Sequence, residues 1–388
     1  MLSEISVTGY KALNNQTPLS LRNLNILAGA NASGKSSLLQ TLLLLRQSID
    51  SNGEINYLRL SGSLYEAGTA QDIMHPACER TIKIALKENE QNNSYIFHLD
   101  RNNETPASAR KINLVSQEKN TPKSLKKNGL GFSYINAERI GPRVTYSLPP
   151  EEINESGLVG KYGEYTTAAL ARAASDVFSI DKWNDSAALI LAEACRILDK
   201  KDIHDELIKT EGRLDLVCNL MLSWIIPGAK FEARESHNTD SSTLSFIRDP
   251  EASRTNTRPT HIGFGLTYTL PIITAALSLK QGGILIVENP EAHLHPFSQS
   301  RIGVFLALVA SLGRQVFVET HSDHVINGIR LAVKYSLLDS NEVILNSFEK
   351  SEDMLNTTIT QIKISADGRP EKWPNGFFDQ LENDLMML

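Results

Sequence analysis

The stretch that decides the fold lies at residues 29–36 and reads Gly29-Ala30-Asn31-Ala32-Ser33-Gly34-Lys35-Ser36. It follows the pattern G-x-x-x-x-G-K-[ST], which forms a phosphate-binding loop when it joins a strand to a helix. An apolar run precedes it at residues 24–28, and a long apolar helical pattern follows it at residues 37–45. Because both flanks have the required character, a chance glycine-rich turn is the weaker interpretation.

Each residue type in this loop has a physical task. Glycines allow a tight loop whose backbone N–H groups point at a chain of phosphates, and the following helix N-terminus adds a positive partial charge. Lys35 would reach the terminal phosphates, and the Ser36 hydroxyl would bind Mg²⁺. The loop therefore predicts nucleotide contacts from Gly29, Ala30, Asn31, Ala32, Ser33, Gly34, Lys35, Ser36 and Ser37.

A second motif follows the buried-strand pattern of residues 284–287 and reads Glu288-Asn289-Pro290-Glu291. An acid at the end of such a strand is expected opposite the loop, where it would hold Mg²⁺ through water. We assign this role to Glu288, although an acid at a strand end can also simply meet solvent. The Asn289 amide cannot accept a proton from water. Either Glu291 reaches the water, or hydrolysis is slow.

Two further elements complete the predicted site. The strand pattern at residues 315–318 leads to His321, which could contact a γ-phosphate or orient water, or could be a satisfied histidine at a helix start. The turn at residues 261–267 enters an apolar helical pattern, and Gly263, Gly265 and Thr267 could form an anion site there. The alternative for this turn is a glycine-rich loop capped by threonine.

The pattern along the chain predicts an α/β domain that is split in the sequence. Residues 1–145 combine the phosphate loop with short alternating runs that predict an antiparallel β subdomain, residues 146–255 form a helical insertion, and residues 256–388 return to strand–helix alternation. Apolar residues recur at helical spacing between about 164 and 226, for example at Leu191, Ala194 and Leu198. We therefore expect one nucleotide-binding domain with a helical insertion.

Charge and composition narrow the possible partners. The net charge of −6 argues against a broad nucleic-acid-binding face. The best basic cluster lies in a polar stretch without aromatic residues, so it is interpreted as a solvated loop; its members are Lys119, Lys123, Lys126 and Lys127. No apolar run approaches the roughly 20 residues needed to span a bilayer. The N-terminus lacks the pattern of a signal peptide, so we expect a cytoplasmic protein with reduced cysteines.

Taken in order, these motifs resemble a known family. The order G-x-N-x-x-G-K-S-S, G-F-G-x-[ST], apolar-E-N-P-E-A-H-L-H-P and E-T-H-S-D-H resembles the ABC-type ATPases of the SMC/RecF/OLD-like branch. More narrowly, it resembles the AAA-annotated ATPases encoded in prokaryotic operons that defend against phages. The C-terminal stretch at residues 373–380, Trp-Pro-Asn-Gly-Phe-Phe-Asp-Gln, also resembles that subgroup. The resemblance is thin in the helical insertion.

The resemblance implies an ABC-type ATPase head that binds ATP and Mg²⁺. It implies a homodimer or larger assembly with ATP held between two copies, in which residues 29–37 and Glu288 of one copy face the 263–267 turn of the other. His321 would be the switch histidine. Transporter-like members carry Asp followed by a catalytic Glu where this chain has Glu288 and Asn289. That departure fits slow hydrolysis.

Three functions remain open at this point. The first is a regulatory ATPase that assembles on ATP and controls a separate effector, expected to be a nuclease. The segment after His321 is short for another catalytic domain, so any cutting of nucleic acid is expected to come from that partner. The second is a RecF-like DNA-repair ATPase, which the acidic net charge disfavours. The third is a nucleotide-stabilised scaffold with little hydrolysis, for which Asn289 is the best support.

Overall fold

The computed structural model describes residues 1–78, 80–100, 105–118, 121–126, 131–150, 157–176, 179–236, 238–247, 256–351, 355–373 and 386–387. Lys119 and Lys127 of the basic cluster, and residues 374–380 of the C-terminal motif, lie outside these ranges. Within them, no helix is both long and apolar enough to cross a membrane.

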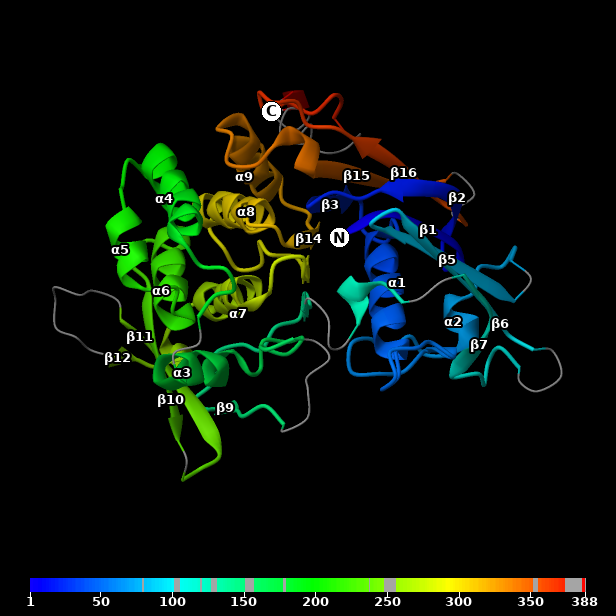
Figure 1. The fold of residues 1–388 in the computed structure, drawn as a ribbon, viewed down its shortest axis with the longest axis horizontal. Helices are drawn as coiled ribbons and strands as arrows, with labels where there is room; N and C mark the ends of the chain where they lie inside the picture. The colour runs from blue at the N-terminus through cyan, green and yellow to red at the C-terminus, as the bar shows by residue number, and fades with distance from the viewer. Residues whose placement is uncertain are drawn as a thin grey trace.

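A mainly parallel sheet forms the centre of the molecule (Figure 1). Five neighbouring strands pair in parallel, and the last edge strand, β16, pairs antiparallel with β15. The strand that leads to the phosphate loop, β3, lies between β15 and β14, so the strands that end in Glu288 and Glu319 lie to one side of it. In spatial order the strands are β16 (Thr357–Ile362), β15 (Val343–Lys350), β3 (Leu24–Gly29), β14 (Gln315–Glu319), β13 (Ile284–Glu288) and β8 (Phe132–Ile135).

The two faces of this sheet bury against different layers. Successive strand residues point to opposite faces, and in β13 Ile284 and Ile286 join the cluster around helix α1 (Lys35–Ser48), whereas Leu285 and Val287 join the helices on the other side. Helix α1 is buried nearly all round, which is expected of a helix packed between two sheets. The helices of the opposite face are α7 (Phe264–Ser278), α8 (Pro296–Ser311) and α9 (Asp323–Lys334).

A second sheet is antiparallel, as the alternating runs predict. Strand β5 shows the alternation directly, because Ile82, Ile84 and Leu86 are buried while the residues between them are more exposed. These buried side chains belong to the same cluster as those of α1. In spatial order the strands are β2 (Leu13–Ser20), β1 (Leu2–Tyr10), β5 (Thr81–Glu88), β6 (Gln91–His98), β7 (Lys111–Glu118) and β4 (Tyr57–Arg59); the short helix α2 (Ala70–Ile73) lies beside them.

The middle of the chain forms the expected helices and also a small sheet that the sequence analysis did not predict. Its helices are α3 (Thr166–Asp176), α4 (Asp185–Asp199), α5 (His204–Lys209) and α6 (Leu214–Ile225). Its strands are β9 (Tyr146–Ser147), β10 (Lys230–Ser236), β11 (Ser241–Ile247) and β12 (Asn256–Thr257). The short 3-10 segments η1 (Lys123–Leu125), η2 (Pro259–His261) and η3 (Ser340–Glu342) complete the described elements.

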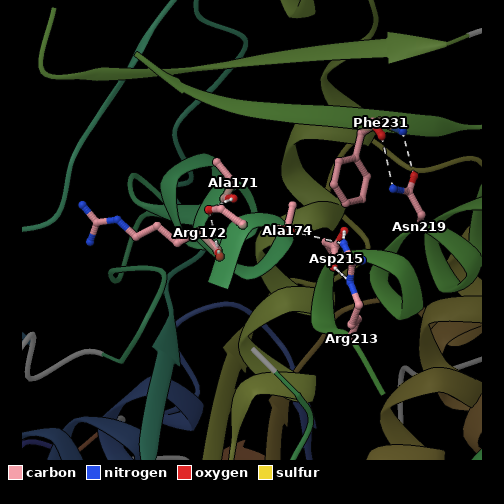
Figure 2. A network of polar contacts seen from close by, with 8 residues as sticks. Ala171, Arg172, Ala174, Arg213, Asp215, Asn219 and Phe231 are labelled. Carbon is pink, nitrogen blue, oxygen red and sulfur yellow. Dashed lines mark hydrogen bonds and ion pairs between the residues drawn. The ribbon is translucent and has the colours of Figure 1, made fainter. Parts of the chain in front are cut away.

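Polar contacts fix α6 against the hairpin formed by β10 and β11, and against α3 (Figure 2). The Asn219 side chain makes two hydrogen bonds with the backbone of Phe231: its Nδ2 donates to the carbonyl at 3.1 Å, and its Oδ1 accepts from the N–H at 2.9 Å. Arg213 forms an ion pair with Asp215 at 3.0 Å, and its Nη2 also donates to the carbonyl of Ala174 at 3.4 Å. The two hydrogen bonds between Asn219 and Phe231 hold β10 beside α6.

Candidate nucleotide-binding site

The phosphate loop joins β3 to α1, in the context that the sequence predicts. Its two glycines are required by the backbone. Gly29 has φ 141° and Gly34 has φ 104°, and a Cβ on Gly29 would lie 2.3 Å from the carbonyl oxygen of Phe348. The Lys35 ammonium donates to the carbonyls of Gly29 at 2.9 Å and Ala30 at 2.7 Å. The lysine therefore folds back onto the loop.

A cavity of about 450 Å³ opens beside this loop. It brings together two of the predicted elements, the phosphate loop and His321. Lys11, Gln40 and Lys350 also line the cavity, and the sequence analysis found no motif that includes them. The lining residues are Lys11, Ala12, Asn31, Ala32, Ser33, Gly34, Lys35, Ser36, Ser37, Gln40, Glu319, His321 and Lys350.

The carboxylate that contacts the loop is Glu319, at the end of β14. Its Oε1 accepts a hydrogen bond from the Ser36 hydroxyl at 2.8 Å, while its Oε2 is buried without a partner among the described residues. Burial raises the pKa of Glu319 to about 7, against the lowering effect of the Ser36 hydrogen bond. The sequence analysis gave Glu319 no role. Glu319 is an acid at the end of the strand that pairs with β3, which is a signal for a metal-binding role. That signal can be recognised only when the strand order is known.

Glu288 lies one strand further from the loop. The parallel register pairs it with Glu319, and its carboxylate accepts from the Tyr134 hydroxyl at 3.0 Å and from the backbone N–H of Ala137 at 3.4 Å. Burial raises the pKa of Glu288 as well. The sequence analysis paired Ser36 with Glu288 as magnesium ligands, whereas in this structure the hydroxyl of Ser36 contacts Glu319.

The chemistry of these groups fits Mg²⁺. That ion is usually held by one or two carboxylates, water and substrate phosphates, and not by a cage of protein ligands. The described residues contain no cluster of three or more histidine, cysteine, aspartate or glutamate side chains able to hold a metal. They do place the Ser36 hydroxyl beside a carboxylate that has one unpartnered oxygen. Ser36 and Glu319 would hold the ion, with Glu288 close behind, and the ion would neutralise phosphate charge.

Glu291 reaches the same region from the loop after β13. Its carboxylate accepts from the Thr320 hydroxyl and from the backbone N–H of His321, both at 2.8 Å. Asn289 takes up the turn, with φ 45°, and its N–H donates to the carbonyl of Glu319 at 2.8 Å. His321 itself is surface-accessible, and burial of part of the ring lowers its pKa, with the charge of Lys35 adding to the effect. Glu291 and His321 are thus neighbours.

Arg139 is a further residue that the sequence analysis missed. It is 3% exposed, and its Nη2 donates to the backbone carbonyls of Glu288 and of Asn289, the latter at 3.0 Å. Its guanidinium lies 5.6 Å from the ring centroid of Tyr268 in α7. Its Nε and Nη1 have no partner among the described residues. Arg139 therefore joins the end of β13 to the start of α7.

The 263–267 turn does not line the nucleotide cavity. Gly263 is the N-cap of α7 and has open space around it, whereas a Cβ on Gly265 would lie 2.8 Å from the carbonyl oxygen of His293. The Thr267 hydroxyl is buried and donates to the carbonyl of Phe264 at 3.0 Å. The turn is thus close to the loop after β13 and is not part of the cavity lining of its own chain.

The raised pKa of Glu319 gives a prediction for the nucleotide-free protein. Because its folded pKa, about 7, exceeds the ordinary value of 4.5, its contribution to stability is fully present below that ordinary value and is lost as the pH rises through 7. The loss should be about 3 kcal/mol. Urea unfolding at several pH values should therefore show a steeper fall for wild type than for Glu319→Gln. Parallel curves for the two proteins would contradict the assignment.

Comparisons with sequence families agree with this geometry. Residues 1–138 match the model described as "AAA ATPase domain", and residues 169–327 match the model described as "AAA domain, putative AbiEii toxin, Type IV TA system". Residues 338–388 match a model described as "Protein of unknown function (DUF3696)". No curated protein matches the chain. The first two matches cover both the phosphate loop and the strand that ends in Glu288.

Comparisons with solved structures show the fold. An SMC head bound to the C-terminal winged-helix domain of ScpA aligns over 94% of this chain and 98% of its own, with 11% identity and a TM-score of 0.50. The SMC head domain from Thermotoga maritima aligns over 92% and 98%, with 12% identity and a TM-score of 0.41. An SMC head with an extended coiled coil, bound to the C-terminal domain of ScpA from Pyrococcus furiosus, aligns over 100% and 98%, with 11% identity and a TM-score of 0.48. The first of these matches confirms the expected fold, an SMC-like head of the ABC type.

Proposed function

We propose that this chain, an ATPase of the SMC and ABC head type, binds ATP with Mg²⁺, hydrolyses it slowly in sites shared between two copies, and controls a separate effector protein. The observation that carries the proposal is the single cavity that unites Lys35, Ser36, Glu319 and His321. One cation for phosphates, one hydroxyl with a carboxylate for the metal, and one histidine near the terminal phosphate are the groups that nucleotide hydrolysis needs.

The position of residues 263–267, at the N-cap and in the first turn of α7, supports the proposal of a shared site. Gly263 faces open space at the N-terminus of α7, where backbone N–H groups and the helix dipole favour an anion. Because this turn lies outside the nucleotide cavity of its own chain, a second copy is the natural source of the γ-phosphate that it would contact. ATP would then join two copies by being bound from both sides.

The residues after β13 support the proposal of slow hydrolysis. Asn289 offers an amide where a carboxylate would serve as the base, and Glu291 is the acid that remains nearby, held by Thr320 and His321. A slow ATPase suits a switch, because each nucleotide state persists long enough to be recognised by a partner. The same Asn289 supports the second candidate, a scaffold that ATP stabilises with almost no turnover.

We propose a nuclease acting in prokaryotic defence as the effector. The supporting observations are the sequence match to a toxin–antitoxin ATPase model and the motif order. An SMC head of the same fold is bound to a separate protein, ScpA, which is a precedent for partner docking on such a head. Direct DNA gripping of the RecF kind is less well supported, since the net charge is −6.

The deciding experiment measures phosphate release from ATP across protein concentrations, with the mass of the species measured in parallel. Sites shared between copies require turnover per chain that rises with concentration, together with a heavier species that needs ATP. Binding with no turnover would favour the scaffold. Turnover independent of concentration from a monomer would overturn the shared site.

A charge placed at the N-terminus of α7 should block assembly and leave the monomer intact. In Gly263→Asp the new side chain has open space and a favourable N-cap position, so the fold should be kept or slightly stabilised. Its carboxylate would repel the γ-phosphate brought by the other copy, and the ATP-dependent dimer should weaken at least about tenfold. Gly263→Asn is the matched neutral cap. Mass measurement with ATP that finds the same dimer in both variants would exclude this turn from the interface.

A further inference from the structure

A second and larger cavity lies in the helical region, away from the nucleotide. Its volume is about 830 Å³, and we call it the α6 groove; it is bounded by Leu216, Leu220 and Ser223 of α6, by Phe231 of β10 and by Phe297 of α8. Phe297 is 41% exposed although it is a large apolar side chain. Nothing in the proposed ATPase cycle uses this surface.

Helix α6 is apolar on two faces. One face packs into the core through Val217, Met221 and Ile225, which are fully buried. The other carries Leu216, Leu220 and Ser223, spaced by four and three residues; all three line the groove, and Leu220 also packs against the edge of the core. A helix with apolar residues on both sides normally packs on both sides. The second face of α6 is therefore fit to receive another helix.

Two polar side chains that line the groove, Asn219 and Asp199, are already bonded inside the chain. Both ends of the Asn219 amide are bonded to the backbone of Phe231 (Figure 2). Asp199 is held by the guanidinium of Arg301 and by the Trp224 indole N–H, the latter at 2.6 Å. A polar ligand would have to compete with these bonds, whereas an apolar surface would not, so the floor favours apolar contacts.

The rim of the groove is cationic. Three exposed lysines line the groove: Lys201, Lys209 and Lys230. Two acids line it as well: Asp199 is paired with Arg301, and Glu206 is exposed. This local excess of positive charge stands out in a chain whose net charge is −6. Complementarity of charge selects partners and accelerates their encounter. The rim thus selects carboxylates.

We propose that the α6 groove docks an amphipathic helix of the effector, with apolar side chains against Leu216 and Leu220 and with carboxylates facing the three lysines. An apolar helix face laid into a groove, with anchors at helical spacing, is a recurrent mode of recognition. The groove assigns a docking surface to the partner, and it rests on the proposed function for the existence of that partner.

The test uses three fluorescent peptides of about 15 residues, long enough to form helix. One is amphipathic with glutamate flanks, one has the same apolar positions with lysine flanks, and one keeps the glutamates but scrambles the apolar order. Fluorescence anisotropy with the full chain should show at least about tenfold tighter binding of the first. Replacing all three rim lysines by glutamate should reverse the preference toward the lysine-flanked peptide. No preference among the peptides, or an unchanged order after charge reversal, would overturn the proposal.

Two further measurements separate other occupants. Leu220→Arg should remove binding of the first peptide, with Leu220→Met as the control of similar size. If the peptide-free chain forms dimers that Leu220→Arg dissolves, a second copy occupies the groove and the proposal is wrong. If dodecanoate binds one to one and the peptides do not, the cavity is a small-molecule pocket and the proposal is equally wrong. Lys35→Ala should bind the first peptide like wild type, so a failed ATPase and a failed groove are distinguishable.

Discussion

Lys35→Ala should weaken ATP binding by at least about 100-fold, because two charge-assisted hydrogen bonds to phosphate are lost at once. The Lys35 ammonium, which lines the cavity, is held by the carbonyls of Gly29 and Ala30. Burial lowers its pKa, while Glu319 and then Glu291 act to raise it. Phosphates would replace the carbonyls as acceptors. The alanine variant offers them no cation in return.

Isothermal titration with ATP and Mg²⁺ measures this loss directly. Lys83→Ala is the control, because Lys83 is exposed on β5 and takes no part in the cavity. Any ATP-dependent dimer should disappear with the binding. An ATP affinity of Lys35→Ala equal to that of wild type would refute the phosphate-loop assignment, whatever the turnover.

Glu291→Gln should slow ATP hydrolysis by about 100-fold to 10,000-fold, which is the usual effect of losing a general base. Glutamine keeps the size of the side chain; its amide oxygen can accept from the His321 N–H, and its NH2 group can donate to the Thr320 hydroxyl, which bonds to the other carboxylate oxygen of Glu291. It cannot take a proton from water. ATP affinity should therefore stay within a few-fold of wild type while phosphate release nearly stops.

Single-turnover assays separate the chemical step from binding in this variant. Glu342→Gln is a suitable control, because Glu342 lies in η3 at the start of β15 and away from the cavity. If Glu291→Gln hydrolyses ATP at the wild-type rate, the base is another group, and His321 or Glu319 becomes the next candidate. Loss of ATP binding in Glu291→Gln would instead assign Glu291 to the nucleotide contacts.

The sequence predicts the local secondary structure around the candidate site residues. The phosphate loop, the strand that ends at Glu288, the strand that leads to His321, and the helix start at Gly263 each depend on residues that are neighbours in the chain. Their flanking patterns have the period of a buried strand or of an apolar helix, so the local structure could be read directly. The alternating apolar residues of the first third of the chain likewise predict its antiparallel strands.

The parts that sequence reasoning missed depend on contacts between distant segments. Ser36 meets Glu319 because β14, and not β13, pairs with β3, and no local pattern fixes that order. Arg139 reaches the carbonyls of Glu288 and Asn289 from a loop about 150 residues earlier in the chain. The small sheet of β9 to β12 was hidden by short, polar strands. Side-chain partners across a sheet become visible only when the register is known.

Helix α8 begins just after the loop that carries Glu291, and its first turn borders the α6 groove. His295 caps it, Phe297 lines the groove, and Arg301 lies against both Phe297 and Trp224. The first turn of α8 thus lies at the groove, and the loop just before it carries Glu291, which bonds to Thr320 and His321. Thermodynamic reciprocity then applies to the pair: a groove ligand that binds tenfold more tightly when ATP is present must raise the affinity for ATP by the same factor. Through α8 the abundance of a partner in the cell would set how much of the chain carries nucleotide, as much as nucleotide sets how much of it carries a partner.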